Sequence, residues 1–195
     1  MGTTVYWMNT SVDLLIEQSP DDHTGEEGTG SWIRIDEELH RAFNKRGREL
    51  ALAIEGRVIY EMMESYWPPA RHDMSLPDFL REWADIWTDM PKVLVSNTRA
   101  HAEHNTRIVG GSDALDQIAQ IRAETDGVIG VGGATLATQL LQCGLLDEIV
   151  LYTHPAILGT GRPLFDALEA PLILDLLEQE RFASGVTMHH YAIRQ

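Results

Sequence analysis

Residues 127–161, GVIGVGGATLATQLLQCGLLDEIVLYTHPAILGTG, hold the densest structural signal in the chain. A short apolar run ends in the glycine-rich turn Gly130–Gly133, after which leucines recur at the spacing of one helical face. Cys143-Gly144 is typical of a helix end, and residues 149–153 are rich in β-forming side chains. The order is therefore strand, glycine turn, helix and strand. Glycines in such a turn let backbone N–H groups approach a ligand, and the free N–H donors of the following helix favour a phosphate or pyrophosphate.

The same region resembles a known enzyme family over a long run. The matching motifs are Gly132-Gly133-Ala-Thr-Leu-Ala, Gly144-Leu-Leu-Asp-Glu-Ile, His154-Pro155 and Leu158-Gly-Thr-Gly-Arg-Pro-Leu-Phe165. They resemble the reductase half of the bifunctional deaminase–reductase of riboflavin biosynthesis, and even more closely its stand-alone dihydrofolate-reductase-like relatives. Weaker matches extend over most of the chain. The resemblance implies one domain over residues 1–195, with a dihydrofolate-reductase-like three-layer α/β/α fold. It also implies an NADPH-dependent reductase that acts on a small heterocyclic or carbonyl substrate.

Composition excludes several classes of protein. At 195 residues and 44% apolar, the chain fits one globular domain with a full-sized core, and no apolar run approaches the roughly 18 residues of a membrane span. The net charge of −15 disfavours nucleic acid and anionic membranes as partners. A single cysteine, Cys143, cannot form an internal disulfide, and the N-terminus lacks the pattern of a secretory signal. We therefore expect a cytoplasmic protein.

Strand and helix signals alternate up to about residue 150 and then give way to strands. Strands are expected at 3–8, 50–54, 92–96, 107–109, 148–153, 171–182 and 185–193, and helices at 36–45, from Gly56-Arg57 onward, at 76–87 and at 112–123, the last capped by Ser112 or Asp113. This order predicts a mixed, mostly parallel sheet with an antiparallel hairpin at the C-terminus. Residues 18–31 are polar and rich in turn formers, and we interpret them as a long loop that closes over the site.

Three predicted strand ends carry residues suited to a dinucleotide, and ligands of open parallel sheets collect at that edge. Gly56-Arg57-Val-Ile-Tyr60-Glu61 resembles the family motif Gly-Arg-x-Thr-Tyr-Glu, with Ile59 in place of the threonine. The resemblance implies that Arg57 pairs with the pyrophosphate; the alternative is an ordinary surface arginine. The next strand end lies where the family binds the adenosine 2′-phosphate, although Asn97 departs from its pattern and a plain polar loop is the alternative. The predicted cofactor contacts are Gly56, Arg57, Ser96, Asn97, Thr98, Arg99, Gly130, Val131, Gly132, Gly133, Ala134 and Thr135.

Two further residues are candidates for contact with substrate. Thr10-Ser11-Val12-Asp13-Leu14 aligns with the family's Ser-Leu-Asp-Gly, and Leu14 stands in place of the glycine. Asp13 either orients the substrate and assists proton delivery, as a catalytic residue, or caps the loop through its carboxylate. Trp32 either lines the substrate cleft or packs in the core. We expect no metal site, since His101 and His104 lack a third ligand at suitable spacing.

The main departure from the family pattern concerns the substrate. The riboflavin-pathway reductases carry a glutamate where this chain has Val131, and the chain lacks the zinc-binding deaminase half. Two alternatives stay open beside the general reductase: a 5-amino-6-(5-phosphoribosylamino)uracil reductase, and a catalytically silent nucleotide-binding module. We also expect a homodimer, because members of the family commonly pair and because the tryptophans between residues 67 and 87 and the late β-rich segment supply apolar surface.

Overall fold

The structure is a computed structural model that describes residues 1–18, 32–168 and 170–194. Its strands are β1 (Thr3–Thr10), β2 (Leu15–Glu17), β3 (Leu50–Gly56), β4 (Lys92–Val95), β5 (Thr106–Val109), β6 (Val128–Gly132), β7 (Glu148–Thr153), β8 (Arg162–Pro163), β9 (Leu174–Arg181) and β10 (Thr187–Ile193). Its helices are α1 (Glu37–Arg48), α2 (Arg57–Ala70), α3 (Asp78–Asp89), α4 (Ala114–Glu124) and α5 (Ala134–Gln142). The expected closing loop lies outside the described residues, apart from its first residue.

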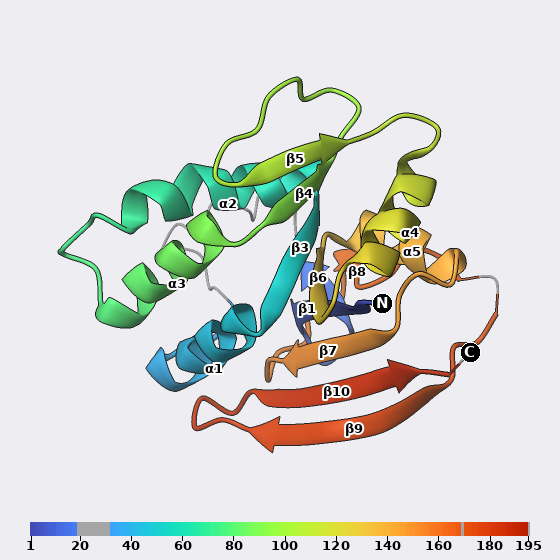
Figure 1. Cartoon of the computed structure of the whole chain (residues 1–195). Coiled ribbons are helices and arrows are strands. Elements are labelled where there is room, and N and C mark those ends of the chain that lie inside the picture. Colours follow the sequence, from blue (N-terminus) through green and yellow to red (C-terminus); the bar gives the residue numbers. More distant parts are fainter. Residues whose placement is uncertain (19–31, 169, 195) are drawn as a thin grey trace.

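Eight strands form the central sheet, in the order β5-β4-β3-β6-β1-β7-β10-β9 (Figure 1). Every neighbouring pair from β5 to β7 is parallel, β10 runs antiparallel to β7, and β9 runs antiparallel to β10. The mostly parallel sheet with its antiparallel C-terminal hairpin confirms the fold that the sequence predicts. The parallel strands place their carboxyl ends at one edge, where the predicted site residues follow them.

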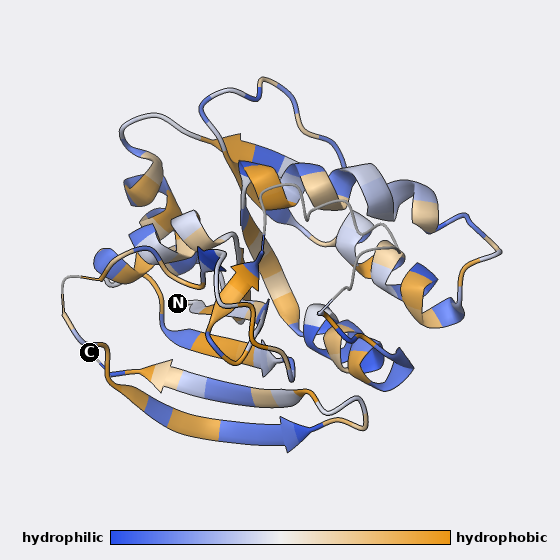
Figure 2. Ribbon diagram, turned by 180° about the vertical axis from the view of Figure 1, so that it is seen from behind, coloured by the Kyte–Doolittle hydropathy of each residue, from blue (hydrophilic) through white to orange (hydrophobic). Residues whose placement is uncertain are grey.

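Helices cover both faces of the sheet, which makes three layers (Figure 1). Alternate residues of a strand point to opposite faces, so neighbouring strand residues enter different clusters. Ile54 packs with Ile118 of α4 and Leu140 of α5 on one face, whereas Ala53 packs with Tyr60 of α2 and Trp87 of α3 on the other. Figure 2 shows apolar colour concentrated on these central strands and on the inner sides of the helices.

The predicted element boundaries hold to within a few residues, and the structure adds two short strands. The short strands β2 and β8, which pair with each other, escape prediction because two or three residues carry no periodicity. Asp113 is the N-cap residue of α4, one of the two predicted positions, but its side chain makes no capping hydrogen bond. Trp83 and Trp87 are 6% and 0% exposed, so they belong to the core and supply no surface for a dimer.

None of the helices in the described parts of the chain is both long and apolar enough to cross a bilayer.

Candidate cofactor and active site

Two glycine turns meet at the carboxyl edge of the sheet. Gly132, the last residue of β6, lies beside Glu55 of β3 in the parallel register. A Cβ on Gly56 would lie 3.6 Å from the carbonyl oxygen of Gly132, and one on Gly133 would lie 3.8 Å from the backbone nitrogen of Gly56. The turn before α2 therefore packs directly against the turn before α5.

Both helices that leave these turns have free N-terminal donors. Gly56 and Gly133 are the N-caps of α2 and α5, neither helix has a side-chain cap, and neither has an acidic residue in its first turn. Gly133 has φ +102°, which side chains rarely adopt. The first N–H groups of a helix lack partners inside it, and its dipole is positive there. Two adjacent ends of this kind fit the two phosphates of a dinucleotide.

The turn at Gly132 has little room for a side chain. A Cβ there would lie 3.2 Å from Cγ of Glu55 and 3.3 Å from Cγ2 of Ile59. Val131 and Ala134 are 3% and 2% exposed, so these two predicted cofactor residues can reach a ligand only through their backbone. A ligand at this turn would thus meet peptide groups rather than side chains.

Arg57 and Arg99 come from different strand ends, and one carboxylate joins them. Nη1 of Arg57 donates to Oε2 of Glu61 at 2.7 Å, and Nη1 of Arg99 donates to Oε1 of the same residue at 3.3 Å. Arg99 also donates to Glu64 at 3.1 Å. The structure therefore brings the two predicted cationic residues of the cofactor site to one acidic partner.

The turn after β4 is organised by its own polar side chains. Oγ of Ser96 accepts from the backbone N–H groups of Thr98 and Arg99 at 3.2 and 3.1 Å. Oδ1 of Asn97 accepts from the N–H of Gly111 at 2.7 Å, which ties this turn to the glycine pair Gly110-Gly111 at the end of β5. The sequence analysis overlooked Gly110-Gly111, although a glycine pair between a strand and a helix was a visible signal.

Asp13 makes the contacts of a loop cap. Its carboxylate accepts from Oγ of Ser11 at 2.6 Å and from the N–H groups of Leu158 and Gly159 at 3.1 and 2.8 Å. These donors, the Ser11 hydroxyl foremost, lower the pKa of Asp13 to about 2. The group is ionised at neutral pH and ties the 158–161 turn to the end of β1. These contacts favour the capping alternative, and the catalytic role stays a prediction.

Trp32 lies at the same edge, against His154. The indole is half-buried, and its ring meets the His154 ring edge-on at 5.6 Å. Nδ1 of His154 accepts from the N–H of Arg34 at 2.9 Å, so the ring proton belongs on Nε2, which lies 2.9 Å from Oδ1 of Asn9. Burial, and then the charge of Arg34, lower the pKa of His154 to about 4. A neutral histidine that the sequence analysis missed thus fixes Trp32 beside β1 and β7.

Arg162 is a second residue of this edge that was not among the predicted site residues. Its Nη2 donates to Oγ1 of Thr135, in the first turn of α5, at 3.0 Å. Its Nη1 lies 3.7 Å from Oε1 of Glu17. The family-like run around Gly161-Arg162 was visible in the sequence, but only the hydrogen bond to Thr135 shows that it returns to the glycine turn.

A buried carboxyl lies directly behind the glycine turn. Oε1 of Glu55 accepts from Nε1 of Trp87 at 3.1 Å, and Oε2 has no hydrogen-bond partner among the described residues. Burial raises the pKa of Glu55 to about 7. On the same face, Nζ of Lys92 lies 4.5 Å from the Trp87 ring centroid, and burial lowers the pKa of Lys92 to about 8. The strands that carry these two groups are mostly apolar in sequence, so the burial of two ionisable side chains was not predicted.

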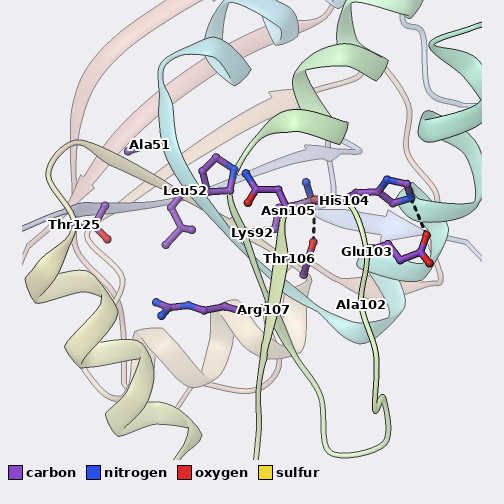
Figure 3. Close-up of a pocket in the computed structure, with 11 residues that line it drawn as sticks. Ala51, Leu52, Lys92, Ala102, Glu103, His104, Asn105, Thr106, Arg107 and Thr125 are labelled. Atoms are coloured by element: carbon purple, nitrogen blue, oxygen red, sulfur yellow. Dashed lines mark hydrogen bonds and ion pairs between the residues drawn. The ribbon is translucent and has the colours of Figure 1, made fainter.

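The opposite edge of the sheet carries an open cavity of about 540 Å³ (Figure 3). It lies at the amino ends of β3, β4 and β5, and its lining includes Leu52, His104 and Arg107. No predicted cofactor or substrate residue lines it. Lys92 belongs to the lining, but its Nζ donates to the carbonyl of Met90 at 2.8 Å within the core. The cavity and the predicted site therefore lie at different edges.

Comparisons with known proteins agree with the family resemblance of the sequence motifs. Residues 16–188 match the RibD C-terminal domain family. The chain belongs to this family. It is 26% identical over 168 residues to the uncharacterized protein YyaP of Bacillus subtilis (strain 168), with 86% of each chain covered. A putative riboflavin biosynthesis protein from Shewanella sp. PV-4 has a TM-score of 0.68 at 22% identity, with 99% of both chains covered. Dihydrofolate reductase from Enterococcus faecalis, complexed with NADP(H), has a TM-score of 0.57 at 12% identity, with 100% and 98% covered.

Proposed function

We propose that this protein is an NADPH-dependent reductase of the dihydrofolate-reductase-like superfamily, acting on a small heterocyclic or carbonyl substrate. The observation that carries the proposal is the contact between Gly56 and Gly132–Gly133, which aims two uncapped helix N-termini at one place. Membership of the RibD C-terminal domain family supports it. The dihydrofolate-reductase fold of a neighbour that binds NADP(H) supports it as well.

The chain's own residues have distinct tasks in this proposal. The N–H groups at the starts of α2 and α5 bind the pyrophosphate, and the turn Ser96–Arg99 binds the adenosine end. When bound, the cofactor supplies a hydride to the substrate. Trp32 bounds the substrate side of the site, and Asp13 holds the turn at Gly159 against β1. The protein accelerates such a reaction by holding donor and acceptor in place and by keeping water out.

Thermal unfolding with and without NADPH tests the cofactor part of the proposal. A ligand that binds only the folded state raises the midpoint of unfolding. We expect binding in the micromolar range and a clear upward shift. The absence of any shift at millimolar NADPH overturns the assignment. Hydride turnover is then measured with pteridines, flavin precursors and quinones as acceptors.

The riboflavin-pathway reaction is the second candidate, favoured by the family itself. We expect weak turnover of the phosphoribosylamino-pyrimidine, because Val131 offers neither charge nor acceptor where the pathway enzymes carry glutamate. Sites that lose a hydrogen-bond partner can lose discrimination by factors on the order of 10⁴. Rapid NADPH oxidation with this substrate would establish the second candidate. Bound nucleotide without turnover on any acceptor would instead indicate a silent binding module.

We further propose a homodimer with a cytoplasmic location. The apolar surface that supports pairing lies on and beside the edge strand β9, where Ile173, Leu176 and Leu177 are 54%, 52% and 53% exposed. Exposed edge strands with apolar side chains are commonly covered by a partner. Light scattering at tens of micromolar tests this, and a monomer would contradict it. The single cysteine, Cys143, supports a reducing compartment.

A further inference from the structure

Four charged side chains form one connected group beside the predicted adenosine site. Nη1 of Arg57 donates to Glu61, Nη1 of Arg99 donates to the other oxygen of Glu61, and Nη2 of Arg99 donates to both oxygens of Glu64 at 3.4 and 3.1 Å. Two positive and two negative charges cancel within this group. The cations that a phosphate would use are therefore already neutralised.

Arg99 has little left to offer a new anion. Besides its bonds to Glu61 and Glu64, its Nε donates to the carbonyl oxygen of His101 at 3.3 Å, so all three guanidinium nitrogens are engaged. Its side chain is 28% exposed, and those of Glu61 and Glu64 are 35% and 22% exposed. Partly buried pairs of this kind are screened less by salt than surface pairs.

Glu64 is held in place by a hydrogen bond from a residue of the core. The hydroxyl of the buried Tyr60 donates to Oε1 of Glu64 at 3.1 Å, and the Tyr60 ring lies 5.8 Å from the guanidinium carbon of Arg99. A phosphate that approached Arg99 could not simply push Glu64 away, since that would break the hydrogen bond from Tyr60 as well as the ion pair with Arg99. Glu61, by contrast, lies one helical turn from Arg57 and could rotate into solvent.

We infer that Glu61 and Glu64 set the cofactor preference of the site and reduce the difference in affinity between NADPH and NADH. The inference rests on the proposed binding of a nicotinamide dinucleotide along this edge. A 2′-phosphate would bring negative charge next to two carboxylates that compete with it for Arg57 and Arg99. The 2′-hydroxyl of NADH can instead donate a hydrogen bond to a carboxylate, as it does to an acidic residue in other dinucleotide sites. The arginines favour NADPH, and the glutamates favour NADH.

Equilibrium binding of NADPH, NADH, 2′,5′-ADP and 5′-AMP to the full chain tests this. We expect the unmodified protein to bind NADPH and NADH within about tenfold of each other. Glu61→Gln keeps the size of the side chain and removes its charge, and should raise the NADPH-to-NADH affinity ratio about fivefold to tenfold. Glu64→Gln should act in the same direction, and the two adenosine fragments should follow the same order.

Glu37→Gln is the matched control. Glu37 makes the same (i, i+4) ion pair with Arg41 on α1, so its replacement removes the same charge without touching Arg57 or Arg99. The NADPH-to-NADH affinity ratio of Glu37→Gln should equal that of the unmodified protein. An unchanged or lowered ratio in both Glu61→Gln and Glu64→Gln, with both nucleotides still bound, overturns the inference alone. Failure of the unmodified protein to bind any of the four probes overturns the proposed function, and the inference with it.

Discussion

The two edges of the central sheet differ in what they offer a ligand. The amino edge of β3, β4 and β5 is hollow, with an open cavity of about 540 Å³ bounded by side chains. The carboxyl edge instead has glycine turns, two uncapped helix N-termini and two arginines. Helix N-termini bind phosphates through their peptide N–H groups, so the pyrophosphate of a dinucleotide suits the carboxyl edge. Chemistry, rather than concavity, therefore locates the candidate site in this molecule.

Gly132→Asp should have the largest effect and would break the carboxyl edge selectively. The new side chain would meet Glu55 and Ile59 at 3.2–3.3 Å from its Cβ, and its charge would face the place proposed for phosphate. We expect loss of NADPH affinity by more than about 100-fold, from lost donors and charge repulsion together. Binding is measured by calorimetry, after circular dichroism has shown that the variant is folded.

Gly132→Ala and Arg107→Ala complete this comparison. Gly132→Ala adds the same Cβ without a charge, so it should weaken NADPH binding less than Gly132→Asp does. It also keeps the site testable if the aspartate variant does not fold. Arg107 lines the amino-edge cavity, so its replacement should leave NADPH affinity unchanged. A folded Gly132→Asp that binds normally, or an Arg107→Ala that does not bind, would move the nucleotide to the other edge.

Glu55→Gln should change how stability depends on pH. The pKa of Glu55 is raised from 4.5 to about 7, so the folded chain keeps this proton to higher pH than the unfolded chain. Its stabilising contribution is full below about pH 4.5 and is lost as the pH rises through about 7. Gln resembles the protonated acid and still accepts from Trp87. The stability of the variant relative to the unmodified protein should therefore rise by about 2–3 kcal/mol between pH 5 and pH 8.

The difference between the two proteins isolates Glu55, together with Lys92, whose pKa the Glu55 charge raises, from the other titrating groups. His154 has a lowered pKa, so its contribution to stability is lost as the pH falls and has the opposite slope. That slope is common to both proteins and cancels in the difference. Urea unfolding at pH 5 and pH 8 measures it. A difference that stays the same at pH 5 and pH 8 would show that Glu55 is solvated in solution.

The sequence predicted the residues with backbone roles better than those with side-chain networks. Glycine turns, helix periodicity and the family motifs located Gly56, Arg57 and Gly132–Gly133 at one edge, because strand ends of a parallel sheet must meet there. Gly130 was also expected in the turn, but it lies inside β6, paired with Ala53. Nothing local shows that Arg57 and Arg99 share Glu61, since that contact depends on the spacing of β3 and β4. The same limit applies to Glu55 and Lys92, whose burial under Trp87 is set by the packing of α3.

Asp13→Asn separates the capping role of this residue from a catalytic one. Asn keeps one side-chain oxygen, so it retains part of the bonding to Ser11, Leu158 and Gly159. We expect turnover to fall less than about tenfold, through a looser turn, whereas loss of a general acid or base typically costs 10²–10⁴-fold. Steady-state rates with the best acceptor give the answer. A drop of 10³-fold with unchanged NADPH affinity would assign the catalytic role to Asp13.

Leu14→Gly should have the smallest effect, and it compares backbone strain at the two edges. Leu14, at the carboxyl edge, has φ +58°, whereas Asn105, at the amino edge, has φ +57°. This left-handed conformation costs most residues about 1–2 kcal/mol, but asparagine adopts it readily. Glycine removes the strain and adds flexibility to the unfolded chain, which offsets about 0.4–1 kcal/mol. Leu14→Gly should therefore gain about 0.5 kcal/mol, Leu14→Ala should gain nothing, and Asn105→Gly should lose stability. Denaturant midpoints rank the four proteins, and a Leu14→Ala at least as stable as Leu14→Gly would show that the turn relaxes to a different backbone conformation in solution.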